Sequence, residues 1–335
     1  MLSRGRIEWL DLFRGLAAIV VVLFHYRDIL GIHWLDFGYV AVDMFFVLSG
    51  IVLGRRYTDE IASGMPIRKF VLVRLRRLYP MVFIAAAFVV AMNFAGIPSR
   101  PYLLATREYA WMLFLVLPLP KAWPMGVSFP ADFPMWSLWA ELASNLVWYA
   151  AVKYGRRWLR YAGVGLLLIM IWMAHNKHSM DMGVRQGVGV LFFALVRALA
   201  WFSVGCVIAA NRQSRALPVL PILAALMVAF AFYNWHPSWV AAILSDALGA
   251  LLLQALYLAK VPIPSVAWAA KWLGKWSFPL YLLHIPAGRL IPYLPASWPT
   301  AVSSVFAVIA VSIVGMFCNE FIVERLHRRP KSDPH

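Results

Sequence analysis

Ten runs of mainly apolar residues, each long enough to cross a bilayer, follow one another along this 335-residue chain. A helix needs about 20 such residues to span the hydrocarbon core, because each residue advances it by about 1.5 Å. The runs are 10–30, 37–54, 72–94, 136–153, 158–175, 188–210, 217–234, 239–259, 277–295 and 299–322. Since 62% of the residues are apolar and 14% are charged, the composition excludes a soluble globule and a disordered chain. We predict an all-α polytopic membrane helical bundle with about ten transmembrane helices.

An eleventh apolar segment, 102–120, differs from the ten runs because it contains Arg107, Glu108, Pro118 and Pro120. Lys and Arg concentrate in the cytoplasmic loops of membrane proteins, so their positions indicate whether this segment crosses. With ten crossings and a cytoplasmic N-terminus, 23 of the 31 Lys and Arg residues fall on the cytoplasmic side. An eleventh crossing would move every later basic loop to the outside. We therefore predict a re-entrant or interfacial outer helix near 102–120, with both termini in the cytoplasm.

The net charge of +16 would favour nucleic-acid binding in a soluble protein. Here the basic cytoplasmic loops account for it, so we expect membrane lipids as partners and no nucleic acid. The two cysteines, Cys206 and Cys318, lie in apolar runs without a motif partner. We expect two buried thiols, with no disulfide and no metal site.

The N-terminal sequence has basic residues before an apolar run, as a signal peptide does. Asp11 and Arg14 interrupt the start of that run and no small-residue cleavage site follows it, so we expect a retained first helix. We predict one transmembrane domain, 1–325, and a short basic cytoplasmic tail, 326–335.

Ionisable residues within the predicted spans are candidates for function, because each costs roughly 2.5–3.5 kcal/mol to insert. The first span contains Arg14 and His25, the second contains Asp43 and the fourth contains Glu141. For those in later spans, polar pairing between helices is the simpler interpretation. They are Arg197, Asp246, His284 and Glu320.

Arg14 and His25 are eleven residues apart, which is close to three helical turns and about 16 Å of rise. Both side chains should therefore lie on one face of the first helix. His25 is either a general base, since imidazole titrates near neutral pH, or a histidine packed against a neighbouring helix. For Arg14 the simpler interpretation is an anchor at the end of the span or an ion pair with Asp11. His284 leaves the same two alternatives open as His25.

A basic segment, 68–77, precedes the third span. Arg74 and Arg77 are three residues apart and can share a helix face, where two guanidinium groups could hold phosphate oxygens. Ordinary positive-inside charge explains the same residues and is the simpler interpretation when they are considered alone.

Six motifs occur in a fixed order between residue 8 and about residue 325. They are Leu10-Asp11-Leu12-Phe13-Arg14-Gly15 running on to His25, Val42-Asp43-Met44-Phe45-Phe46 within 38–50, the basic segment from Phe70 to Pro80, Trp136-Ser137-Leu138-Trp139-Ala140-Glu141, the stretch from Leu273 to His284, and Glu324-Arg325. This set resembles the acyltransferase-3 family of integral membrane acyltransferases. The chain departs from the family in having Leu142 where a second Glu usually follows Glu141. Many members also carry a C-terminal hydrolase-like domain, for which we expect no room here.

The resemblance implies an enzyme that moves an acyl group, commonly acetyl from cytoplasmic acetyl-CoA, to a hydroxyl of a glycan or other extracytoplasmic acceptor. It implies a bacterial plasma membrane location, acyl-CoA as co-substrate, and no tightly bound cofactor or metal. His25 is then expected as general base together with Arg14, and Asp43 or Glu141 is expected to orient its imidazole. The residues expected to hold the CoA phosphates are Arg74, Arg76 and Arg77. Ser137, Trp136 or the backbone of Ser49-Gly50 are candidates for stabilising the oxyanion.

The competing interpretation is a polytopic transporter or flippase for a glycan or lipid-linked substrate, which would use the same intramembrane charges without making a bond. Such proteins often contain inverted repeats or matching broken spans, and we find neither in this sequence. Release of free thiol from acyl-CoA in the presence of acceptor separates the two classes. The sequence leaves the identity of the acceptor, the acyl chain length and the oligomeric state open.

Overall fold

The computed structural model describes residues 7–32, 35, 38–97, 132, 134–155, 159–180, 188–211, 239–259 and 264–327. Within these ranges the chain forms nine α-helices and one 3-10 helix and contains no strand, which confirms the all-α prediction for this part of the chain. The helices are α1 (Glu8–Leu30), α2 (Val40–Ala62), α3 (Ile67–Phe94), α5 (Met135–Gly155), α6 (Leu159–Lys177), α7 (Val188–Ala210), α9 (Trp239–Leu258), α10 (Pro264–Ala287), η2 (Gly288–Tyr293) and α11 (Thr300–His327). The predicted span 217–234 and the predicted outer helix 102–120 lie outside the described residues.

Five of the described helices are long and apolar enough to cross a membrane by length and composition, namely α1, α3, α7, α9 and α11. The protein is therefore an integral membrane protein, whereas the full set of ten crossings stays a prediction.

The position of α10 differs from the predicted span 277–295. The helix begins at Pro264 and therefore includes Lys271 and Lys275, which precede the predicted span. Lys275 forms an ion pair with Glu320 of α11, so its charge is compensated within the bundle. At the other end α10 stops at Ala287, and the chain continues as the 3-10 helix η2.

Two helix pairs with close backbone contact hold the bundle together. A Cβ atom on Gly50 of α2 would clash with the carbonyl oxygen of Phe202 in α7, and one on Gly205 would clash with the carbonyl oxygen of Val47. A Cβ atom on Gly15 of α1 would likewise clash with Leu273 of α10. Small residues are typical of helix contacts in membranes, because packing replaces the hydrophobic effect there.

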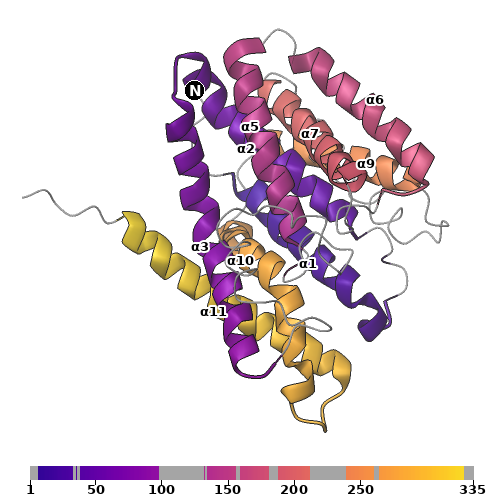
Figure 1. Cartoon of the computed structure of the whole chain (residues 1–335), viewed down its shortest axis with the longest axis vertical. Coiled ribbons are helices and arrows are strands. Elements are labelled where there is room, and N and C mark those ends of the chain that lie inside the picture. The colour runs from indigo at the N-terminus through magenta and orange to yellow at the C-terminus, as the bar shows by residue number, and fades with distance from the viewer. Residues whose placement is uncertain are drawn as a thin grey trace, which may run out of the picture.

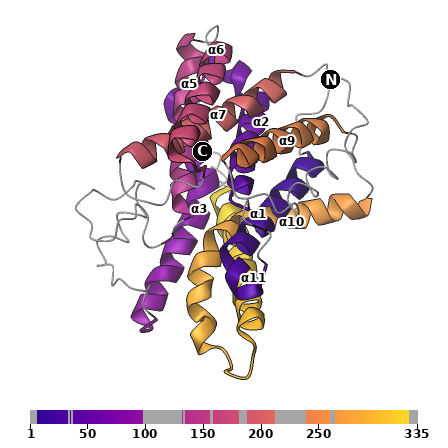
Figure 2. The same ribbon diagram turned by 90° about the vertical axis from the view of Figure 1, so that its right-hand side faces the viewer.

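The helices of each pair run in the same direction, as the predicted order of crossings requires. In α1 and α10, Arg14 lies beside Gly274 and Tyr26 lies beside His284. α6 and α7 lie toward one end of the long axis of the molecule and α10 and α11 toward the other, with α2 between them (Figure 1, Figure 2). The seam between α1 and α10 joins the first helix of the chain to a helix near its C-terminal end.

The prediction of two buried thiols is wrong for Cys318. Cys206 is half-buried beside the carbonyl of Gly50, whereas Cys318 is exposed on α11. Its neighbours Phe317 and Phe321 are also exposed. An apolar run cannot distinguish the side of a helix that faces lipid from the side that faces the bundle, since both are apolar.

Candidate active site

The seam between α1 and α10 begins at Arg14. Its Nε donates to Ser277 Oγ at 3.0 Å and its Nη2 donates to the carbonyl of Gly274 at 2.6 Å. Nη2 also lies 2.8 Å from Oδ1 of Asp11, so the predicted ion pair between these residues is present. Arg14 thereby joins the first motif of the sequence to the late motif.

His25, the predicted general base, lies on the same face of α1 and also contacts α10. Its Nδ1 is 3.3 Å from Nε2 of His284, and the two ring centroids are 4.9 Å apart. His284 is fully buried, whereas His25 is exposed at the surface of the bundle. The predicted common face of Arg14 and His25 is thus present, and it brings a second imidazole against the first.

The backbone contacts of the two imidazoles determine which ring nitrogens carry hydrogen. His25 Nδ1 lies 2.9 Å from the carbonyl of Val21, and His284 Nδ1 lies 2.7 Å from the carbonyl of Tyr281. A carbonyl can only accept a hydrogen bond, so Nδ1 is the protonated nitrogen in both neutral rings. His25 Nδ1–H is then shared between the Val21 carbonyl and His284 Nε2. The lone pair of neutral His25 is therefore on Nε2.

Hydroxyl groups surround this imidazole pair. Tyr26 donates to the carbonyl of His284 at 2.7 Å. One turn earlier on α10, the Tyr281 hydroxyl lies 2.6 Å from Ser137 Oγ at the start of α5. Ser137 donates to the carbonyl of Pro134 at 2.9 Å. Ser137, a predicted oxyanion donor, is thus held close to α10. At Ser49, whose backbone was another candidate, the side chain donates to Glu141.

Asp43 is paired with Arg197 of α7. Nε and Nη2 of Arg197 donate to the two carboxylate oxygens of Asp43 at 2.6 and 2.7 Å, and Nη1 donates to the carbonyl of Met180 at 2.7 Å. Asp43 is 0% exposed and Arg197 is 1% exposed. A third buried ionisable side chain, Asp246 of α9, lies close enough to interact with both. The sequence predicts polar pairing between helices for Arg197 and Asp246, and the pair of Arg197 with Asp43 confirms it for Arg197.

Glu141 is paired with Arg74 of α3. Its Oε1 accepts from Arg74 Nη2 at 2.6 Å and from Ser49 Oγ at 2.8 Å. Asn145, one turn later on α5, completes the arrangement, because its side-chain oxygen accepts from Nη2 and Nε of Arg74 at 3.1 and 3.0 Å. Arg74 is buried among these groups, whereas Arg76 and Arg77 are exposed.

Several of the residues expected to act on His25 or on CoA are engaged with other partners in the structure. Asp43 and Glu141, the two candidates for orienting His25, each hold a guanidinium group, and the side chain placed against His25 is His284. The three arginines expected to bind CoA differ in exposure, because Arg74 is buried inside the bundle while Arg76 and Arg77 are exposed. The partner of each carboxylate carried no signal in the sequence, but His284 stood in a recognisable motif one turn after Tyr281.

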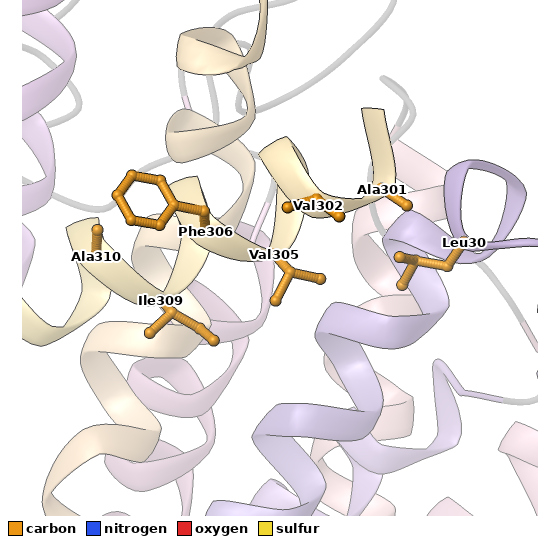
Figure 3. Close-up of a pocket in the computed structure, with 7 residues that line it drawn as sticks. All are labelled: Leu30, Ala301, Val302, Val305, Phe306, Ile309 and Ala310. Atoms are coloured by element: carbon orange, nitrogen blue, oxygen red, sulfur yellow. The ribbon is translucent and has the colours of Figure 1, made fainter. Parts of the chain in front are cut away.

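An apolar groove lies away from these polar groups, between α1 and α11. It has a volume of about 590 Å³ and is lined by Leu30 of α1 and by apolar side chains of α11 (Figure 3). Those from α11 are Ala301, Val302, Val305, Phe306, Ile309 and Ala310. Such a lining suits hydrocarbon chains and offers no group that could hold the phosphates of CoA.

A family model described as an acyltransferase domain matches residues 7–318 of this chain. Protein 2 in picA locus of Rhizobium radiobacter is 33% identical over 160 residues, which are 44% of this chain and 82% of that protein. No solved structure matches.

Two longer relatives match this chain with lower identity. Peptidoglycan O-acetyltransferase OatA of Listeria monocytogenes is 25% identical over 363 aligned residues, covering 96% of this chain and 56% of that protein. Exopolysaccharide production protein ExoZ of Rhizobium meliloti is 27% identical over 150 residues, 45% of each chain. This chain thus spans about half the length of these two relatives.

Proposed function

This chain belongs to the acyltransferase-3 family, whose domain model covers nearly all of it, and we propose that it is an integral membrane O-acyltransferase. In this proposal it moves an acyl group, acetyl in the simplest case, from cytoplasmic acyl-CoA to a hydroxyl of a glycan on the outer side of the plasma membrane. The names of two relatives, a peptidoglycan O-acetyltransferase and an exopolysaccharide production protein, support a glycan acceptor. The distribution of basic residues supports cytoplasmic termini.

The observation that carries the proposal is the contact between His25 and His284. Because Nδ1 of His25 is the protonated nitrogen, its Nε2 can accept a proton from an acceptor hydroxyl. The resulting imidazolium still donates from Nδ1 to His284 Nε2, which stabilises the cation and fixes the ring. His284 thereby does for His25 what a carboxylate does for the histidine of other acyl-transfer sites.

The chemical step needs no group beyond the two substrates and this base. The acceptor oxygen attacks the carbonyl carbon of the thioester while its proton passes to Nε2 of His25. The new C–O bond forms, the C–S bond breaks, and the proton is delivered to the departing thiolate to give free CoA. The hydroxyl groups of Tyr281, one turn before His284, and of Ser137, which contacts Tyr281, are the candidates for stabilising the oxyanion, and one of them would exchange its present hydrogen bond for that contact.

On the opposite side of the membrane, CoA would bind to the exposed basic residues at the start of α3. Arg68, Lys69, Arg76 and Arg77 are all exposed there, and CoA phosphates are polyanionic. Arg74 has a different part in this proposal, since it is buried against Glu141 and anchors α3 to α5. Asp43 similarly anchors α2 to α7 through Arg197.

Replacement of His25 tests the proposal directly. We expect His25→Ala to lower the rate of thiol release from acetyl-CoA by about a hundredfold or more, the usual contribution of a general base. His284→Ala should lower kcat less and leave the KM for acetyl-CoA unchanged. The assay uses purified protein in nanodiscs, with glycan extracted from a deletion strain as acceptor.

His175→Ala is the matched control, because this histidine is exposed on α6 and lies outside the site. It should retain the wild-type rate. Near wild-type acyl transfer by a folded His25→Ala protein would refute the role of His25. Absence of thiol release from the wild-type protein with glycan present would refute the acyltransferase proposal itself.

A further inference from the structure

We propose that Asp132 and Arg289 form a subsite that binds neighbouring hydroxyl groups of a sugar acceptor beside the imidazole pair. This inference rests on the proposed function, since it names the residues that would hold the glycan. It starts from a carboxylate whose surroundings are unusual for a folded protein.

Asp132 is buried, at 3% exposure, just before the first turn of α5. Both of its carboxylate oxygens lack a hydrogen-bond partner. Buried polar atoms are nearly always hydrogen-bonded, because an unsatisfied one costs about 1–3 kcal/mol. A structural carboxylate would be expected to cap the helix or to accept side-chain donors, and Asp132 does neither. Two free acceptor oxygens facing no protein donor are suited to the hydroxyl groups of a ligand.

Arg289 supplies the complementary charge. It lies at the start of η2, five residues after His284, and is half-buried. Burial raises the pKa of Asp132, and the positive charge of Arg289 opposes that effect. A carboxylate that accepts and a guanidinium that donates can together bind two adjacent hydroxyl groups of a sugar ring, whereas a simple alcohol would satisfy one of them.

Continuous contacts connect this subsite to the proposed base. Pro134, two residues after Asp132, accepts through its carbonyl from Ser137, whose hydroxyl lies 2.6 Å from that of Tyr281. The Tyr281 carbonyl in turn accepts from His284, which lies against His25. In the predicted topology this is the outer end of the bundle, where the acceptor would arrive. Hydroxyl groups held at Asp132 and Arg289 would thus direct another hydroxyl of the same glycan toward His25.

Asp132→Asn tests the subsite, because it keeps the shape of the side chain but weakens its acceptor capacity. With glycan from a deletion strain as the acceptor and acetyl-CoA as the donor, we expect the KM for glycan to rise about tenfold, the loss of one hydrogen bond. The KM for acetyl-CoA and the slow hydrolysis of acetyl-CoA without acceptor should stay within about twofold. Arg289→Gln carries the same expectation and serves if Asp132→Asn does not fold.

Asp28→Asn is the matched control, since Asp28 is 83% exposed and lies three residues after His25 near the C-terminal end of α1. It should leave both KM values unchanged. An unchanged KM for glycan in Asp132→Asn and Arg289→Gln would overturn the subsite while leaving the acyltransferase intact. Hydrolysis of acetyl-CoA by the wild-type protein without transfer to glycan would also overturn it. Absence of any thioester cleavage by the wild-type protein would instead remove the proposed function, and the subsite with it.

Discussion

Asp43→Ala should destabilise the protein by about 3 kcal/mol, because it leaves the Arg197 guanidinium buried without the carboxylate that neutralises it. Two charge-assisted hydrogen bonds, at 2.6 and 2.7 Å, are lost. Breaking a buried pair by removing one partner costs about 3–5 kcal/mol. We expect the lower end of that range, because Asp246 lies close enough to interact with Arg197 and the carbonyl of Met180 still accepts from it.

A double variant separates the charge from the volume of these side chains. In Asp43→Ala with Arg197→Met no unpaired guanidinium is left, so much of the lost stability should return. The single Arg197→Met variant should resemble Asp43→Ala, since it leaves Asp43 and Asp246 as two neighbouring buried carboxylates. The double-mutant cycle then gives the coupling energy, which we expect to exceed about 1 kcal/mol.

Thermal unfolding in detergent micelles provides the measurement, with a thiol-reactive dye that reports exposure of Cys206. This thiol is half-buried between α2 and α7, the two helices that the ion pair joins. The experiment uses a Cys318→Ser background, because Cys318 is exposed before unfolding. Thiol release from acetyl-CoA is measured on the same samples.

The two roles considered for Asp43 predict different outcomes. If Asp43 anchors α2 to α7, stability falls and the double variant recovers both stability and acyl transfer. If Asp43 orients His25, acyl transfer falls while unfolding is unchanged, and removing Arg197 as well restores nothing. This second result, or a coupling energy near zero, would refute the reasoning from the ion pair.

Two further predictions concern the helix contacts and the CoA site. Gly50→Leu should prevent the close contact of α2 with α7, because Gly205 lies opposite. It should therefore lower the apparent unfolding temperature in the same dye assay. An unchanged temperature would contradict the packing argument. Arg76→Ala with Arg77→Ala should raise the KM for acetyl-CoA several-fold, with a smaller effect at high salt, and should leave stability unchanged because both side chains are exposed. Arg74→Ala should instead lower stability, because it removes the ion pair with Glu141. An unchanged KM for acetyl-CoA in the double variant would leave these arginines as membrane anchors.

The helices could be predicted from the sequence because hydrocarbon imposes a length on each crossing. Nine of the ten predicted runs overlap with described helices, and the tenth, 217–234, lies outside the described residues. The start of α10 differs from the predicted span because Lys271 and Lys275 lower the hydropathy of its first turns. Lys275 is tolerated in the helix through its pair with Glu320, a contact between distant segments that hydropathy does not record.

Helical periodicity also predicted part of the site. Residues eleven positions apart must lie on nearly one face of a helix, so the common face of Arg14 and His25 could be predicted, whereas the structure was needed to show that this face contacts α10. Pairing between helices has no such rule. Asp43 and Arg197 are 154 positions apart, and nothing in either segment indicates the other.

The pairing of charges also indicates where chemistry is possible in this bundle. Asp43 with Arg197 and Glu141 with Arg74 are carboxylate–guanidinium pairs, in which each charge offsets the cost of burying the other. A carboxylate held by a guanidinium group could act as a base only by breaking that contact. Two neutral imidazoles carry no charge to compensate, and their backbone contacts leave a lone pair on His25 Nε2. A proton can be taken up there and stabilised by His284, which is why we place the base in the imidazole pair and assign the ion pairs to the framework.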